Sequence, residues 1–191
     1  MLRIEQDGRL RRIVLAAPEK RNLLDAAMCG ELLGQLRDAA ADEAVGAILL
    51  EADGQAFCTG LDFEAGEDLV TIGKRISKPL VAAVKGFAMS GGVALLANAH
   101  VVVAAQGSSF GLTDIREGRW NQPVFRAVAD AIGERRTLEL CLTGRVFSTP
   151  DALSWGLVHM VAPAFELDDR AFEIATALSN ADPGAVRAAL R

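Results

Sequence analysis

Three apolar runs constrain the fold of this chain more than any other feature. They cover residues 45–50, 79–85 and 100–105, and almost every position in them is hydrophobic. A strand with one face in water alternates polar and apolar side chains, so these runs indicate strands that are buried on both faces. A helical pattern at 25–41, which Asp25 can cap, lies between the early strands. The sequence therefore predicts an α/β domain whose parallel strands are covered by helices.

The remaining predicted elements are shorter, and the second half of the chain is more helical. A further strand is predicted at 10–16. Helices are predicted at 91–99, 127–132, 134–143, 171–179 and 183–190, and one more starts at Thr149-Pro150. A chain of 191 residues that is 51% hydrophobic is long enough to bury a core. We expect a core domain at 1–165 and a truncated C-terminal helical segment at 166–191.

Composition argues against several classes of function. A net charge of -5 disfavours nucleic acid as a partner, because phosphate binding needs a basic face. The N-terminal residues lack the apolar core of a signal peptide, and Lys85 and His100 interrupt the most apolar stretch, so no membrane partner is expected. Cys29, Cys58 and Cys141 show no metal-ligand spacing and form no disulfide pattern. We therefore expect a cytoplasmic protein without a metal.

Two glycine-rich segments, at 56–62 and 86–92, lie thirty residues apart. Each sits where an apolar strand pattern gives way to a loop or to the start of a helix, so each offers backbone N–H groups that strand pairing does not use. Two such donors aimed at one point would polarise a carbonyl and stabilise the negative charge that develops on its oxygen. The segments therefore predict an oxyanion hole built from main chain.

These segments belong to an ordered set of motifs. The set comprises the loop at 18–22, the segments at 56–62 and 78–92, Phe110-Gly111-Leu112-Thr113-Asp114, and 142–145 with 152–158. It resembles the enoyl-CoA hydratase/isomerase (crotonase) family over most of the chain. The resemblance implies a crotonase-like spiral of ββα units, here with a shortened C-terminal helical region. It also implies an acyl-CoA thioester as the substrate, no separate cofactor, and a homo-oligomer that is a trimer or a hexamer.

The resemblance assigns catalytic roles to three positions and suggests a fourth. The N–H groups of Leu61 and Gly91 are the oxyanion donors, and Asp114 is the acid/base carboxylate. A carboxylate in a partly apolar pocket has a raised pKa, which suits it to shuttle a proton. The alternative for Asp114 is an aspartate that only caps a turn. Glu117 is a second candidate, although a solvated glutamate would also fit its position.

Five residues are candidates for binding coenzyme A. Lys20 and Arg21 can pair with its phosphates, and Asn22 completes that loop. Gly60 and Asp62 belong to the first oxyanion segment, and Asp62 resembles the family residue beside the adenine loop. The alternative is that these polar residues form a solvated turn.

Ala94 decides between reactions, because it stands where hydratases of this family place a second carboxylate. A methyl group cannot activate water, whereas one base suffices to move a proton between two carbons. The sequence thus favours an enoyl-CoA isomerase over a hydratase. Decarboxylation, thioester hydrolysis and an acyl-CoA-binding protein without catalysis stay open as alternatives.

A serine hydrolase is the other alternative, since Ser90 lies beside the oxyanion donors. His100 or His159 would have to supply its base, and nothing in the sequence places either one near Ser90. Cys58 is expected to be an inert, packed thiol. Trp120 and the insertion-like residues 121–123 are interpreted as residues that shape the pocket, and the alternative is a loop that only fills space.

Overall fold

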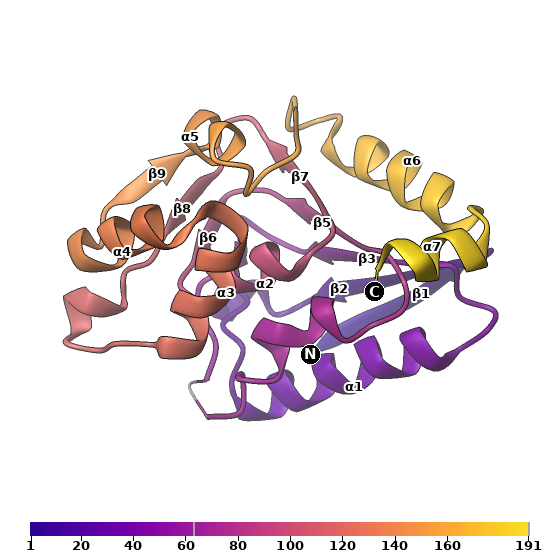
Figure 1. The fold of residues 1–191 in the computed structure, drawn as a ribbon, viewed down its shortest axis with the longest axis horizontal. Coiled ribbons are helices and arrows are strands. Elements are labelled where there is room, and N and C mark those ends of the chain that lie inside the picture. The colour runs from indigo at the N-terminus through magenta and orange to yellow at the C-terminus, as the bar shows by residue number, and fades with distance from the viewer. Residues whose placement is uncertain (63, 191) are drawn as a thin grey trace.

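The computed structural model describes residues 1–62 and 64–190 and contains two β-sheets (Figure 1). The larger sheet has six strands: β1 (Leu2–Asp7), β2 (Leu10–Leu15), β3 (Ala47–Ala52), β5 (Leu80–Val84), β7 (Val101–Ala105) and β10 (Met160–Ala162). The smaller sheet has four short strands: β4 (Ala56–Cys58), β6 (Phe87–Met89), β8 (Ser109–Gly111) and β9 (Val146–Ser148). The sequence does not predict the short strands of the smaller sheet, and β4 and β6 lie within the two glycine-rich segments.

The chain spirals between the two sheets. Strand order is β1-β2-β3-β5-β7-β10 in the large sheet and β4-β6-β8-β9 in the small one. In each of the pairs β3/β4, β5/β6 and β7/β8, the first strand joins the large sheet and the second joins the small sheet. The added strands run parallel to the preceding ones. Only β1 with β2 and β8 with β9 pair antiparallel among the described strands. The predicted α/β class and the spiral of ββα units are confirmed.

Seven α-helices and three short 3-10 helices are described. The α-helices are α1 (Ala26–Ala41), α2 (Gly91–Asn98), α3 (Gln122–Ile132), α4 (Glu134–Thr143), α5 (Thr149–Ser154), α6 (Leu167–Ser179) and α7 (Pro183–Ala189). The 3-10 helices are Pro18–Lys20, Leu69–Lys74 and Asp114–Glu117. Within residues 1–62 and 64–190, no helix combines the length and the hydrophobicity that crossing a bilayer requires.

Side-chain caps explain where several helices begin. The Asp25 carboxylate accepts the Met28 N–H at 3.0 Å, as the sequence predicts for α1. Residues 121–123 are not a simple loop: Asn121 caps α3, accepting the Val124 N–H, and the next residues form its first turn. The cap of α5 is Ser148 in a capping box, one residue before the predicted start.

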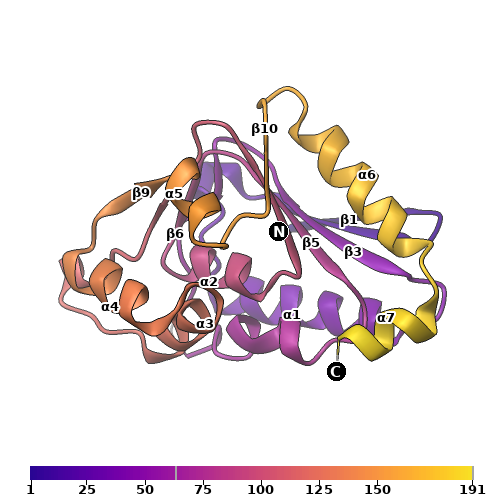
Figure 2. The ribbon, with the colours of Figure 1, turned by 45° about the horizontal axis from the view of Figure 1, so that its top comes forward.

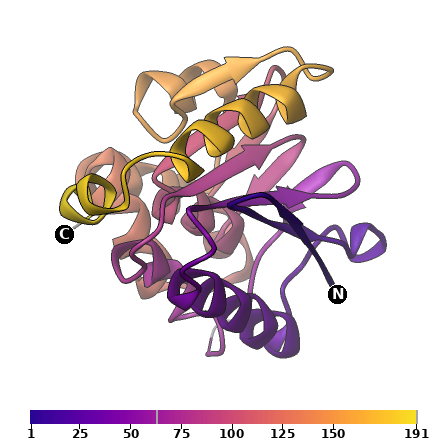
Figure 3. The ribbon, with the colours of Figure 1, turned by 90° about the vertical axis from the view of Figure 1, so that its right-hand side faces the viewer.

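The central strands of the large sheet, β3, β5 and β7, are buried on both faces, as their apolar runs predict. Ile48 and Leu50 face a core shared with α1, α2 and the small sheet, whereas Leu49 and Val81 face α6. Figures 2 and 3 show α6 along one side of the sheet, with α1 on the other. The helix α6 adds Leu167 and other residues to that second core. The division of the chain at residue 165 stays a prediction.

Candidate active site

Pairing of two short strands brings the glycine-rich segments together. Ala56 on β4 lies opposite Phe87 on β6, and the strands run parallel. The contact is close at both ends of the pair. A Cβ built on Gly86 would lie 1.7 Å from the Gln55 carbonyl oxygen, and one on Gly92 would lie 2.3 Å from the Cys58 carbonyl oxygen. Glycine at both positions is what allows the two backbones to approach this closely.

The two predicted oxyanion donors face a common space because of how their neighbours bond. Leu24 forms an isolated parallel bridge with Leu61, in which Leu24 donates to the Gly60 carbonyl at 3.1 Å and accepts from the Asp62 N–H at 2.8 Å. This alternation turns the Leu61 N–H away from Leu24. Gly91 is the first residue of α2, where helical N–H groups have no acceptor within the helix. Among the described residues, neither N–H donates to a protein acceptor.

The donors are also near each other. A Cβ built on Gly91 would lie 2.9 Å from the Leu61 backbone nitrogen and 2.2 Å from its Cγ. A cavity of about 640 Å³ opens beside them and holds most of the predicted site. Its lining residues are Leu23, Leu24, Asp25, Thr59, Gly60, Leu61, Asp62, Glu64, Ser90, Gly91, Thr113, Asp114, Glu117, Arg119 and Asn121. The cavity is large enough for a small acyl group and part of its carrier.

Asp114 stands at the wall of this cavity, where it begins the 3-10 helix Asp114–Glu117. Burial raises the pKa of its carboxyl, while a hydrogen bond from the Ser90 hydroxyl and the charge of Arg119 act in the opposite direction. Glu117 lies in the same lining, but it is exposed and paired with Arg119. Of the two candidate carboxylates, Asp114 alone is half-buried, which favours it as the group that exchanges a proton.

The loop predicted to bind coenzyme A lies beside the cavity mouth. Lys20 is exposed and sits 3.8 Å from the carboxylate of Asp25, which lines the cavity. The Arg21 carbonyl accepts the Thr59 hydroxyl at 3.1 Å, which ties the loop to the first oxyanion segment. Both cationic side chains face solvent and are free to approach a phosphate group.

Asn22 behaves differently from its neighbours, because its side chain is 0% exposed. Its amide nitrogen donates to the carbonyls of Asp53 and Ala56 at 2.9 and 2.8 Å, and its oxygen accepts the Ala17 N–H at 2.9 Å. Every strong hydrogen-bonding position of the amide nitrogen is thereby used. Asn22 fixes the loop against the start of β4, and its side chain is not available to a ligand.

Gly60 and Asp62 both line the cavity. Asp62 is exposed, and its Oδ1 accepts the N–H groups of Glu64 and Ala65 at 3.1 and 2.9 Å. This is a turn-capping arrangement. The second oxygen of the carboxylate is the part of Asp62 that can meet a ligand.

No serine triad forms around Ser90 in the described part of the chain. The Nδ1 atoms of His100 and His159 accept the backbone N–H groups of Leu80 and Val102, at 2.9 and 3.0 Å, and neither ring lines the cavity. Burial lowers the pKa of His100 and raises that of the Cys58 thiol to about 12. A buried thiol with so high a pKa is not a nucleophile at neutral pH.

Ala94 is fully buried in α2 and brings no polar atom to the site. Arg119, Thr59 and Glu64 line the cavity although the sequence does not single them out, and Asn121 lines it as one of the residues interpreted as shaping the pocket. Asn121 had a local signal, the cap followed by proline. Among residues 1–62 and 64–190, no three His, Cys, Asp or Glu side chains are placed to bind one metal ion.

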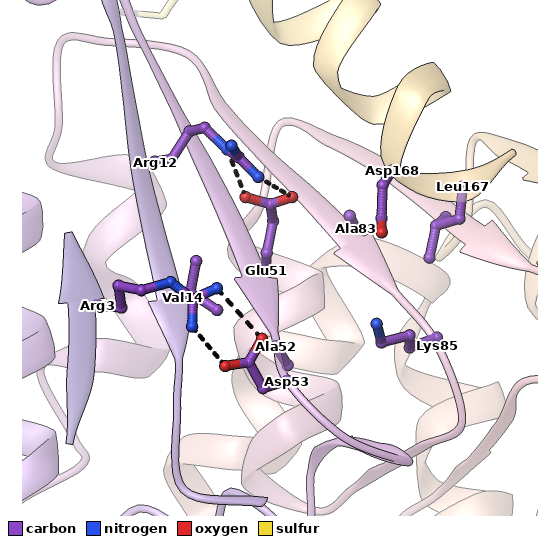
Figure 4. A pocket seen from close by; sticks show the side chains of 10 residues that line it. All are labelled: Arg3, Arg12, Val14, Glu51, Ala52, Asp53, Ala83, Lys85, Leu167 and Asp168. Atoms are coloured by element: carbon purple, nitrogen blue, oxygen red, sulfur yellow. Dashed lines mark hydrogen bonds and ion pairs between the residues drawn. The ribbon is translucent and has the colours of Figure 1, made fainter. Parts of the chain in front are cut away.

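A smaller cavity, of about 80 Å³, lies on the α6 side of the large sheet (Figure 4). It is lined by ion pairs: Arg12 contacts both oxygens of Glu51 at 2.9 and 3.1 Å, and Arg3 contacts those of Asp53 at 2.6 and 3.3 Å. These paired charges lie where the α6 face of the sheet passes from apolar to polar. Lys85 and Asp168 also line this cavity, which at about 80 Å³ is too small for an acyl group, so the larger cavity is the candidate active site.

Comparison with known proteins identifies the family of the chain. A family model described as enoyl-CoA hydratase/isomerase matches residues 5–191. The mevalonyl-coenzyme A hydratase of Aspergillus fumigatus is 32% identical over 92% of this chain and 71% of that protein. The hydroxycinnamoyl-CoA hydratase-lyase of Pseudomonas fluorescens is 27% identical over 98% of this chain and 76% of that protein. The crystal structure of human enoyl coenzyme A hydratase domain-containing protein 3 matches with a TM-score of 0.93 at 26% identity, over 99% of this chain and 81% of that one.

Proposed function

Because this chain belongs to the enoyl-CoA hydratase/isomerase family, we propose that it moves the double bond of an enoyl-CoA thioester. Membership makes it an acyl-CoA enzyme, and the choice of isomerisation is our own. One observation carries that choice. The two free N–H groups are accompanied by a single half-buried carboxylate, and the position of a second one is filled by the buried methyl group of Ala94.

In the proposed mechanism the thioester oxygen accepts hydrogen bonds from the N–H groups of Leu61 and Gly91. The Asp114 carboxylate removes a proton from the carbon next to the thioester carbonyl, and the electron pair moves onto the oxygen. The donors stabilise the resulting enolate as its charge forms. The protonated Asp114 then returns the proton to the far end of the conjugated system, so the double bond shifts and no atom is gained or lost.

The exposed cations at the cavity mouth fit the carrier. Lys20 and Arg21 are proposed to meet the phosphates of coenzyme A, with Gly60 and Asp62 at its entry into the cavity. We further propose a cytoplasmic homo-oligomer, a trimer or a hexamer. Three buried cysteines without a disulfide support a reducing compartment.

Hydration is the second candidate, because both named relatives are hydratases and Glu117 stands three residues from Asp114. Purified protein should be given 3-enoyl-CoA and 2-enoyl-CoA separately. We expect isomerisation of the first, no hydration of the second, and loss of turnover in Asp114→Asn with binding retained. Hydration of 2-enoyl-CoA that Glu117→Gln abolishes would favour the second candidate. Tight binding of acyl-CoA with neither reaction would refute both and leave a non-catalytic binding protein.

A further inference from the structure

Ser90 has an unusual backbone and an unusual hydrogen-bond pattern. It precedes α2 with φ 47° and ψ -107°, a conformation that residues other than glycine rarely adopt. Serine in this position normally caps the helix by accepting an N–H of its first turn. Here the side chain makes no such bond. Backbone strain of this kind persists where the surrounding structure enforces it, commonly at functional sites.

The Ser90 hydroxyl is turned instead toward the segment that carries Asp114. Its oxygen accepts the Thr113 N–H at 3.3 Å, and the hydroxyl lies close enough to the next residue, Asp114, to lower the pKa of its carboxyl as a hydrogen-bond donor. The Ser90 backbone N–H donates to the Gly111 carbonyl at 2.7 Å, which extends the pairing of β6 with β8 by one residue. Ser90 therefore joins the start of α2 to the end of β8 through both its main chain and its side chain.

This link lies between the Gly91 oxyanion donor and Asp114. Ser90 is 7% exposed and lines the cavity, and the next residue supplies the Gly91 oxyanion donor. One residue thus connects the segment that holds the thioester oxygen with the carboxylate that would exchange the proton. A hydroxyl that accepts from the backbone and donates to a carboxylate fixes the orientation of that carboxylate.

We propose that Ser90 is a positioning residue, whose hydroxyl keeps the Asp114 carboxylate in a fixed position relative to the N–H groups of Leu61 and Gly91. This rests on the proposed function only in taking Asp114 as the acid/base group. Ser90 is assigned neither a nucleophilic nor a direct proton-transfer role.

The groups around Asp114 determine in which direction its pKa changes when the Ser90 hydroxyl is removed. Glu117 and Arg119 flank it from its own segment, with opposite effects on its pKa. On α4, burial and, to a smaller extent, the charge of Asp114 raise the pKa of the Cys141 thiol to about 11, so the thiol is neutral at pH 7. Asp25, Asp62 and Glu64 line the same cavity. The Ser90 hydroxyl lowers the pKa of Asp114 against the effect of burial, so its removal raises that pKa.

The experiment compares Ser90→Ala and Ser90→Gly with wild type. Both variants lack the hydroxyl, but alanine keeps the strained Cβ and glycine relieves it, so a shared effect reports the hydroxyl. We expect kcat for 3-enoyl-CoA to fall about tenfold or more in both, with KM changed less, since a hydrogen bond to a charged group is lost. The acidic limb of the rate profile should move to higher pH, because Asp114 must be ionised to act.

The carboxyl of Asp114 should also be titrated by carbon NMR without substrate, with Asp114→Asn used to assign its signal. A higher pKa in both variants supports the proposal even if wild type turns over no enoyl-CoA, in which case the proposed function alone fails. An unchanged pKa in both variants overturns the proposal, even if the enzyme proves to be an isomerase. If one variant does not fold, the other decides by the same readouts.

Discussion

Adding one methyl group at Gly91 tests the oxyanion hole directly. A Cβ there would lie 2.2 and 2.7 Å from the Leu61 Cγ and Cδ2 atoms, and 2.9 Å from its backbone nitrogen. Carbon atoms in ordinary contact are about 3.5–4.0 Å apart, so the two segments must separate by roughly 1.3 Å or more. A displacement of about 1 Å at a reacting group can cost a factor of about 100. Loss of one oxyanion donor costs about 100–1,000-fold in kcat.

We therefore expect Gly91→Ala to lower kcat for 3-enoyl-CoA by about 100-fold or more. Stability should fall by about 1–3 kcal/mol, since the extra atom overfills a close contact. Gly30→Ala is the matched control. Gly30 lies in α1, and a Cβ there meets nothing within 4 Å, so activity should be unchanged and stability should rise by about 0.5–1 kcal/mol.

A second substitution tests whether the loss of activity comes from the clash with the Leu61 side chain. Leu61→Ala removes the two side-chain atoms that the new methyl group meets, but it keeps the Leu61 N–H donor. The double variant should recover part of the activity lost in Gly91→Ala. Steady-state kinetics and thermal unfolding on all four proteins complete the cycle. A folded Gly91→Ala protein whose kcat stays close to wild type would refute the placement of the hole between these segments.

Three further predictions concern single residues. Asp114→Asn should raise the melting temperature at neutral pH but not near pH 3. Burial raises the pKa of this carboxyl in the folded protein, so the carboxylate destabilises the fold once the pH exceeds the carboxyl's pKa in the unfolded chain. Equal melting temperatures of variant and wild type at neutral pH would contradict this. Asn22→Ala should cost about 2 kcal/mol or more in urea unfolding, because buried backbone groups lose their partners, whereas the exposed Lys20→Ala should cost less than about 1 kcal/mol. Native Cys58 should resist iodoacetamide at pH 8 and react only on unfolding, since burial raises its pKa to about 12; mass spectrometry of modified peptides would detect early labelling.

Elements with a strong local signal could be predicted from the sequence. The run at 100–105 is a strand buried on both faces, β7, because it needs no polar side. The helix that Asp25 caps begins where its capping residue indicates. The small sheet could not be predicted this way. Its strands have three residues each, too few for any hydrophobic period, and they exist because distant segments pair.

The same contrast applies to the site: residues in a local motif could be predicted, whereas contacts between distant segments could not. The sequence motifs locate the two oxyanion segments and Asp114, and the cavity brings all of them together. The bridge between Leu24 and Leu61 has no local signal, although it is what turns the Leu61 N–H into the cavity. For Asn22 the sequence predicts too much. A polar residue in a polar loop is interpreted as a ligand-binding group, but the structure shows that the side chain is buried and that its amide bonds only to backbone.

The oxyanion hole and the proton chemistry have different physical origins in this chain. The Leu61 N–H is unpaired because a parallel bridge uses the groups on either side of it, and the Gly91 N–H because the first turn of a helix lacks acceptors. Neither donor depends on a functional side chain, so the same hole can serve any thioester that forms an enolate. In the proposed mechanism, proton transfer depends instead on the carboxyl of Asp114 and on the absence of a second carboxyl at Ala94. On this proposal the side chains beside the hole decide the reaction, so substitutions there should change which product forms, whereas a methyl group at Gly91 should slow every reaction alike.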